Sequence, residues 1–394
     1  MKRVGGGLLL TALALAATLI GHGAVLMLHQ PHVDPPPPRL VDLCARPLAD
    51  RPSSCDASSG DATLLFAGDT AEIDPGLSQI LDEGEGIDWP YRATGDLVRA
   101  ADLAVANLET AISDEDTPAT RWRDTPSHRA PSPSAGALAR AGFDVAGLAN
   151  NHAMDEGRHG LEDTLRFLEG AGILPLGAGV DEASARRGLV VSLGRVRVGL
   201  VAYCERQLGF DLWLRIFARG DRAGVAALDE TTAKQDVARL RASGADVVIV
   251  VTHWGRNDQP PTRGELDAAH ALAASGADLV VGAHAHTPQG IWLIGGIPVA
   301  LGIGNYAFGT RGSGALDGGV LLRAQVTDRR LARLELVPID VQNRRVRFQP
   351  QLLHGEAARA VLVKVIDESR ALGTALALDG DLATLALPSH NGGR

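Results

Sequence analysis

The stretches ADVVIVVTHWG (residues 245–255) and ADLVVGAHAH (residues 277–286) decide the fold of this chain. Each is an apolar, β-branched run of strand length that leads into histidine. The amphipathic segment 263–274 between them has the apolar spacing of a helix. A strand, a helix and a second strand in this order make a parallel βα unit. The pattern therefore predicts an α/β fold in which histidines follow the strand ends.

The same alternation of strands and helices continues along the chain. Apolar runs flank Gly-Arg at 194–195 and Gly-Gly at 295–296, which predicts two hairpins. The coexistence of βα units and hairpins favours two packed sheets flanked by helices. The residues after 372 are rich in Gly, Asp and Ala, and we expect them to fray. The further segments are expected as helices at 133–140, 161–169, 230–242 and 356–372, and as strands at 320–326 and 331–339.

Polar residues follow five of the expected strands. Because the carboxyl ends of parallel strands meet at one edge of a sheet, we expect their side chains to converge. Imidazole, carboxylate and amide oxygen together suit Mn, Fe or Zn better than calcium, which prefers oxygen ligands. The sequence thus predicts a site for one or two divalent ions. The residues in question are Asp69, Asn107, Glu109, Asn150, Asn151, His152, His253, His284 and His286.

Composition excludes several classes of protein. The 394 residues carry 38 Lys+Arg against 47 Asp+Glu, a net charge of −9, so no basic excess is available to neutralise nucleic-acid phosphates. The chain is 45% hydrophobic, which excludes disorder for most of its length. Three cysteines are too few for a disulfide scaffold or a Cys-ligated zinc module.

The N-terminus predicts the compartment. Lys2 and Arg3 precede an uncharged stretch to Leu28, and about 20 apolar residues span a bilayer. We expect residues 1–28 to be a cytoplasmic stub and a signal-anchor transmembrane helix, which makes this a single-pass cell-membrane protein with an extracytoplasmic globular part. A cleaved signal peptide is the rival interpretation. Residues 29–61 are expected to form a stiff, Pro-rich linker with a Cys44–Cys55 disulfide, while Cys204 stays a buried free thiol.

Six motifs together resemble one known family. They are FAGD (66–69), NLET (107–110), LANNH (148–152) with Asp155, HWG (253–255), GAHAHTPQG (282–290) and LGIGNYAF (301–308). In order and spacing they are similar to the CapA family of capsule-synthesis proteins, also called the PgsA-type poly-γ-glutamate family. That family is a branch of the calcineurin-like metallophosphoesterase superfamily.

The resemblance implies a fold and roles for the site residues. It implies a four-layer αββα sandwich of metallophosphoesterase type over residues 62–345, followed by a C-terminal helix and tail at 346–394. Glu109 would bridge two metal ions and His152 would be the general acid. Ala71 stands where phosphoesterases commonly have histidine, Asn257 where CapA proteins often have Glu, and Ala285 where Pro is usual. The implied metal ligands are Asp69, Glu109, Asn151, His253, His284 and His286, and the expected substrate contacts are Asn107, Asn150, Arg129, Trp254 and Asn305.

Three functions stay open from the sequence. The first is a metal-dependent hydrolase or transferase of capsule or envelope polymer biosynthesis. The second is a non-catalytic component of a polyglutamate synthase and export complex in the membrane. The third is a polymer-binding protein that keeps one structural metal. Arg129 lies in an arginine-bearing segment, 113–134, whose planar guanidinium groups suit an anionic partner such as polyglutamate.

Overall fold

A computed structural model describes residues 34–45, 60–71, 80–115, 128–207, 215–308 and 318–388. The described residues from Pro35 onward form one compact unit. The predicted transmembrane segment, residues 1–28, lies outside the described residues. Among those that are described, no helix is both long enough and apolar enough to cross a membrane.

One seven-stranded sheet, here sheet A, carries the two stretches that predicted the fold. Strands β10, β12, β13 and β15 run parallel, and antiparallel strands β9 and β14 flank them. The predicted hairpins are thus confirmed as β9–β10 and β14–β15. In order across the sheet the strands are β1 (Arg39–Asp42), β9 (Leu189–Leu193), β10 (Val196–Cys204), β12 (Val247–His253), β13 (Leu279–Ala283), β15 (Ile297–Ala300) and β14 (Ile291–Ile294).

A second, ten-stranded sheet, here sheet B, is built around β2. Strands β2, β3, β6 and β7 are parallel, whereas β17 and β18 add an antiparallel half. Its main path is β20 (Ala377–Asp379), β21 (Leu382–Ala386), β18 (Arg330–Asp340), β17 (Gly319–Thr327), β2 (Ala62–Ala71), β3 (Leu103–Leu108), β6 (Val145–Gly147) and β7 (Leu174–Leu176); β16 (Asn305–Phe308) pairs with β2, and β19 (Gln351–Leu352) pairs with β18.

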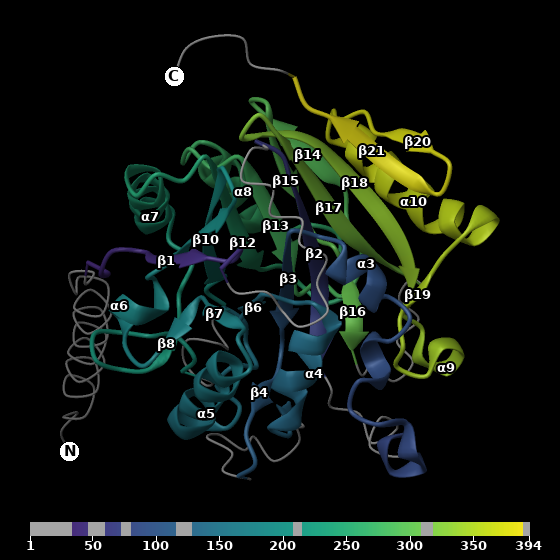
Figure 1. The fold of residues 1–394 in the computed structure, drawn as a ribbon. Helices are drawn as coiled ribbons and strands as arrows, with labels where there is room; N and C mark the ends of the chain where they lie inside the picture. The colour runs from purple at the N-terminus through teal and green to yellow at the C-terminus, as the bar shows by residue number, and fades with distance from the viewer. Residues whose placement is uncertain are drawn as a thin grey trace, which may run out of the picture. The chain divides into compact units, whose positions relative to one another are not determined.

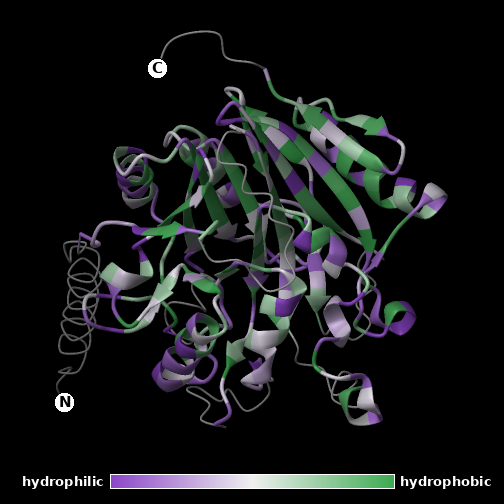
Figure 2. Cartoon of the chain, in the orientation of Figure 1, coloured by the Kyte–Doolittle hydropathy of each residue, from purple (hydrophilic) through white to green (hydrophobic). Residues whose placement is uncertain are grey.

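The two sheets pack face to face between helices, which gives the predicted four layers (Figure 1). Alternate residues of β12 show why: Ile249 joins the core between the sheets, whereas Val248 and Val250 pack with α7 and α8. In Figure 2 the strands at the centre are therefore largely green, while the surrounding helices mix purple, white and green. The helices are α3 (Gly95–Arg99), α4 (Pro133–Ala141), α5 (Gly157–Gly170), α6 (Glu182–Ala185), α7 (Glu230–Ala242), α8 (Arg263–Ala273), α9 (Asn343–Val346) and α10 (Gly355–Ala371).

Short elements complete the unit. The π-helical turn η1 (Leu81–Glu85) and the 3₁₀ turn η2 (Trp89–Tyr91) follow β2. Two small sheets join β4 (Ala111–Ile112) with β5 (Arg129–Ala130), and β8 (Ala178–Gly179) with β11 (Gly224–Val225).

The compact unit extends past the predicted limits of 62 and 345 at both ends. On the N-terminal side β1 pairs with β9, and Arg187 Nε donates to the Pro37 carbonyl at 3.0 Å. Part of the predicted linker is therefore docked on the unit. On the C-terminal side, fraying is the wrong prediction for residues 377–386. Strands β20 and β21 form a hairpin that pairs with β18, because Ala383 and Leu385 bury their side chains there.

The described cysteines agree with the predicted chemistry. Cys44 is disulfide-bonded, whereas Cys204 is free and buried. Cys55, the expected partner of Cys44, lies outside the described residues, so the Cys44–Cys55 pairing stays a prediction.

Candidate functional site

Asp69 is placed by the register of sheet B. It pairs with Asn107 of β3 on one side and with Asn305 of β16 on the other. Its backbone N–H donates to the Gly304 carbonyl at 3.1 Å, and a Cβ on Gly68 would lie 1.8 Å from that oxygen. Glycine at 68 thus permits the close approach of β16 that fixes Asp69. The Asp69 carboxylate is fully buried and accepts from Asn107 Nδ2 at 2.6 Å.

Glu109 follows β3 and brings a second buried carboxylate beside Asp69. Its backbone N–H donates to the Thr70 carbonyl at 2.9 Å, and the residue has no exposed surface. Neither carboxylate oxygen has a hydrogen-bond partner among the described residues. Burial, and then the charge of Asp69, raise the pKa of Glu109 well above its usual value. A buried carboxylate without partners is costly unless a cation or a proton compensates it.

His253 and His284 face Glu109 from the ends of β12 and β13. Donor atoms of the three residues lie within 4.8 Å of one another, and His253 Nε2 is 3.5 Å from Glu109 Oε1. His253 Nε2 also lies 2.6 Å from Asn151 Oδ1, which brings the predicted amide ligand into the same group. Burial and the neighbouring histidines lower the pKa of His253 far below its usual value, and burial lowers that of His284 to about 4. Neutral imidazole is the form that binds metals.

His286 joins Asp69 and Glu109 in a second group whose donor atoms lie within 4.8 Å. His286 Nδ1 is 3.0 Å from Asp69 Oδ2 and 2.8 Å from Asn305 Oδ1. Burial alone would favour its neutral ring, but the charge of Glu109 and the hydrogen bond to Asp69 raise its pKa to about 10. His284 and His286 both have positive φ, 87° and 55°, a strained backbone conformation that is common at functional sites.

His152 lies at the edge of these two groups. Its Nε2 is 3.9 Å from Glu109 Oε1, and its side chain keeps 22% of its surface exposed. The opposite ring nitrogen, Nδ1, lies 2.8 Å from Asp155 Oδ2. This contact fixes the ring so that Nε2 points toward the acidic centre.

Two further residues belong to the neighbourhood but were not among the predicted site residues. His128 stacks on His152, and Asp155 orients His152; the donor atoms of the three lie within 4.8 Å. For Asp155 a signal existed, since it stands three residues after His152 in the matched motif. For His128 the only signal was its place in the arginine-bearing segment 113–134, because it follows no apolar run.

The expected substrate contacts lie mostly in the interior. Asn107 holds Asp69 and lies 3.2 Å from His253 Nδ1, and Asn305 contacts His286. Asn150 is fully buried and donates to the Leu108 carbonyl at 2.8 Å. Trp254 is also fully buried, and its indole nitrogen donates to the Leu301 carbonyl. All four side chains contact other protein groups, so we assign them a supporting role at the site.

Among the expected substrate contacts, Arg129 is the exposed one. Its side chain keeps 35% of its surface, and Nη1 donates to the Ser113 carbonyl at 3.2 Å. Ala71, which stands where phosphoesterases commonly have histidine, is buried at the end of β2.

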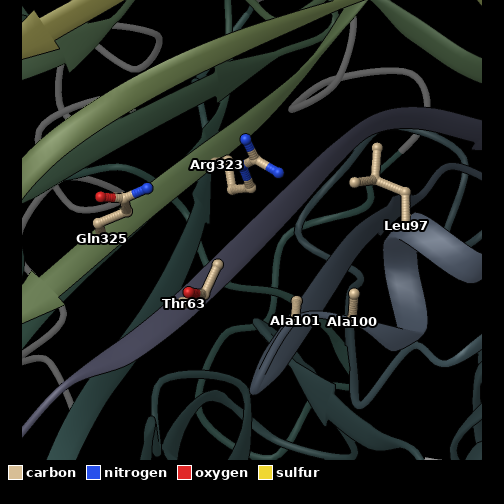
Figure 3. Close-up of a pocket in the computed structure, with 6 residues that line it drawn as sticks. All are labelled: Thr63, Leu97, Ala100, Ala101, Arg323 and Gln325. Carbon is tan, nitrogen blue, oxygen red and sulfur yellow. The ribbon is translucent and has the colours of Figure 1, made fainter.

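A pocket of about 220 Å³ lies elsewhere, toward the amino end of β2 (Figure 3). Its lining includes Thr63 of β2 and Arg323 and Gln325 of β17. Both β17 side chains hydrogen-bond to Glu335, at 2.7 and 3.1 Å. Thr63 stands six positions before Asp69 on the same strand, so this hollow is separate from the histidine groups.

The donor set fits divalent metal ions. Two groups of ligands share Glu109, whose oxygens have no hydrogen-bond partner in the described part of the chain. Carboxylate, imidazole and amide oxygen are suitable ligands for Mn, Fe and Zn.

Comparison with known proteins identifies the family. The model of the family "Bacterial capsule synthesis protein PGA_cap" matches residues 63–310. The chain belongs to this family. All the residues of the two donor groups lie within the matched range, whereas β17, β18 and α10 lie beyond it.

Curated relatives of this PGA_cap protein carry related names. A probable polyglutamine synthesis accessory protein of Mycobacterium tuberculosis is 35% identical over 283 residues, which cover 67% of this chain and 73% of the relative. The PGA biosynthesis protein CapA of Bacillus subtilis is 27% identical over 66% of this chain and 67% of its own length. The capsule biosynthesis protein CapA of Bacillus anthracis is 25% identical over 65% and 62%.

Solved structures resemble the PGA_cap chain more distantly. The calcineurin-like phosphoesterase YfkN of Bacillus subtilis has a TM-score of 0.40 at 16% identity, covering 75% of this chain and 88% of its own. The NAD nucleotidase of Haemophilus influenzae has a TM-score of 0.42 at 12% identity, with coverages of 77% and 62%.

Proposed function

We propose that this PGA_cap protein is a metal-dependent hydrolase or transferase that acts on an anionic envelope polymer of the poly-γ-glutamate type. The observation that carries the proposal is Glu109. Its carboxylate is buried without a hydrogen-bond partner among the described residues, and three histidines and Asp69 surround it. The names of the family and of its relatives support the polymer class.

The two donor groups define where ions would bind. Glu109, His253 and His284, with Asn151 beside them, would hold one ion, and Asp69, Glu109 and His286 would hold a second. Such an ion supplies a Lewis acid that polarises a carbonyl or phosphoryl oxygen. Asn107 and Asn305 would keep the ligands oriented, because each contacts a carboxylate or imidazole of the two groups.

His152 would move the proton. Its Nδ1 is held by Asp155, so Nε2 is free to face a leaving group next to the metal ligands. General acids of this kind typically contribute 10²–10⁴-fold in rate, on the order of 3–5 kcal/mol. The guanidinium group of Arg129, which is exposed near Glu156, would bind the anionic polymer.

The cellular setting is part of the proposal. Lys2 and Arg3 before the apolar stretch support a membrane anchor with the compact unit outside the cytoplasm. The disulfide at Cys44 supports an oxidising compartment. Membrane-bound synthase or export subunits are the expected partners there. A reporter fused after Arg394 should be active outside the cytoplasm and stay in the membrane fraction after a high-salt wash. Release of the intact protein into the medium would mean that residues 1–28 are cleaved.

The decisive test pairs metal analysis with a hydrolysis screen of poly-γ-glutamate and phosphoesters. We expect the full-length protein to bind Mn, Fe or Zn, and His152→Ala to keep the metal but lose turnover. His354→Ala is the matched control, since His354 is exposed and pairs with Asp381. A protein that binds metal but cleaves nothing would be the polymer-binding protein with a structural metal. One that binds no metal would leave the non-catalytic role in a synthase complex.

A further inference from the structure

A second histidine lies face to face with His152. The ring centroids of His128 and His152 are 3.5 Å apart, and their planes differ by only 11°. His128 comes from the residue just before β5, whereas His152 follows β6. The two rings therefore meet although 24 positions separate them, as the residue numbers show.

His128 is itself held by three contacts. Its Nδ1 lies 3.1 Å from the Glu109 carbonyl oxygen, and its backbone N–H donates to Asp155 Oδ2 at 2.7 Å. The ring of Phe308 packs against it at 5.8 Å between centroids and a 67° angle. The Asp155 oxygen that accepts from the His128 backbone is also the one that contacts His152 Nδ1. One carboxylate thus sets the position of both histidines.

We propose that His128 is a positioning residue for His152, with its ring covering one face of the His152 imidazole so that Nε2 stays directed at the bound substrate. This inference rests on the proposed function of His152 as the general acid. Asp155 alone fixes a point in the plane of the His152 ring, and the ring can still tilt about that contact. A stacked ring on the face removes the tilt. Small misplacements of a reacting group cost up to about 100-fold in rate.

The same three residues do not form a third metal position. Donor atoms of His128, His152 and Asp155 lie within 4.8 Å, as a metal site would require. However, an imidazole lone pair lies in the plane of its ring, and two nearly parallel planes 3.5 Å apart do not meet at a common ion. The arrangement suits stacking and not shared ligation.

The test compares His128→Phe, which keeps a flat ring, with His128→Ala in the full-length protein. The substrates are phenyl phosphate and p-nitrophenyl phosphate, because phenol is the poorer leaving group and depends more on a general acid. We expect His128→Ala to lower kcat on phenyl phosphate about 10- to 100-fold, with KM within about twofold. On p-nitrophenyl phosphate the loss should be about threefold or less. His128→Phe should recover most of the loss, and neither variant should change the affinity for Mn²⁺ or Zn²⁺.

A spectroscopic arm tests the stacking without any turnover. With ¹³C-labelled histidine, the His152 ring protons, assigned through His152→Gln, should carry a ring-current shift in the wild type. That shift should vanish in His128→Ala and return in His128→Phe. Unchanged His152 signals in His128→Ala would overturn the proposal, as would equal losses on both substrates or a His128→Phe variant as impaired as His128→Ala. If the wild type cleaves neither substrate, phosphoesters are excluded as substrates, action on the polymer is judged by the hydrolysis screen, and the His152 signals alone decide the role of His128. Should His128→Ala not fold, His128→Leu keeps the volume without the ring.

Discussion

The two ends of β2 each have a buried glutamate nearby, and the two differ in what surrounds them. Toward the amino end, Glu335 accepts from Arg323 at 2.7 Å and from Gln325 at 3.1 Å, and Arg333 lies 3.1 Å away. Toward the carboxyl end, Glu109 has no hydrogen-bond partner among the described residues. Both residues are at most 5% exposed.

This difference distinguishes a structural carboxylate, Glu335, from one that is available to bind a ligand, Glu109. Buried polar groups in folded proteins are almost always hydrogen-bonded, so an exception asks for an explanation. Around Glu335 the charges compensate one another within the chain, although the pocket of Figure 3 lies there. Around Glu109 the compensation is incomplete and the neighbours are imidazoles and a second carboxylate. The incompletely compensated charge of Glu109 is therefore a better indicator of the metal site than the pocket near Glu335 is.

The largest expected effect comes from removing both neutral histidines at the carboxyl end. Replacing His253 and His284 together by alanine should weaken Mn²⁺ or Zn²⁺ binding by more than roughly 100-fold, because two direct ligands exceed the effect of an outer contact. Calorimetric titration of the full-length protein measures it. The exposed His354→Ala variant should match the wild type, and equal affinity in the double variant would disprove the ligand assignment.

Loss of a supporting contact should have a smaller effect. Asn107 donates to Asp69 and lies beside His253 Nδ1, so Asn107→Ala removes orientation and leaves all ligands in place. Metal affinity should fall about 10- to 100-fold. Gln325→Ala, which removes a side-chain amide near the amino end of β2, is the matched control and should leave the metal affinity unchanged. An affinity that is the same in both variants would contradict the role of Asn107.

The two glutamates should respond with opposite signs in stability. In chelator-treated protein, Glu109→Gln should raise the free energy of unfolding by about 1 kcal/mol, since it removes a buried carboxylate that accepts no hydrogen bond among the described residues. Glu335→Gln should lower it by about 1 kcal/mol, because it weakens charge-assisted hydrogen bonds whose arginines are partly exposed. Denaturant unfolding compares the two. A fall in both variants would remove the distinction between the two ends.

The smallest expected effect lies in the amino-end pocket. Thr63 lines it, and its neighbours Arg323 and Gln325 are already paired with Glu335. Thr63→Val should therefore change stability by less than about 0.5 kcal/mol and leave metal binding unaltered. A clear loss of metal binding in this variant would show that the pocket communicates with the histidines.

The strands and their terminal ligands were predictable from the sequence. A strand buried on both faces appears as a continuous β-branched run, as in β12 and β13, and the residue after it must lie at the sheet edge. That argument placed His253 and His284 together. It could not say whether Asn107 or Trp254 would face a substrate or the interior, because that depends on hydrogen bonds to Asp69 and Leu301.

What the sequence did not predict depends on pairing between distant short segments. His128 is delivered by the two-residue strand β5, which exists only because it pairs with β4. Similarly, β20 and β21 form because β18 offers an edge to pair with. Neither segment has an apolar run long enough to be recognised by itself.

The most direct test of the central claim is a Mn²⁺ and Zn²⁺ titration of chelator-treated, full-length protein, comparing the wild type with Glu109→Gln and Glu335→Gln. We predict that the wild type and Glu335→Gln bind one or two ions per chain with the same affinity. Glu109→Gln should bind at least about tenfold more weakly, because both donor groups share this carboxylate. Equal binding by Glu109→Gln and wild type, or no binding by the wild type, would contradict the claim that Glu109, which has no hydrogen-bond partner among the described residues, is a metal ligand.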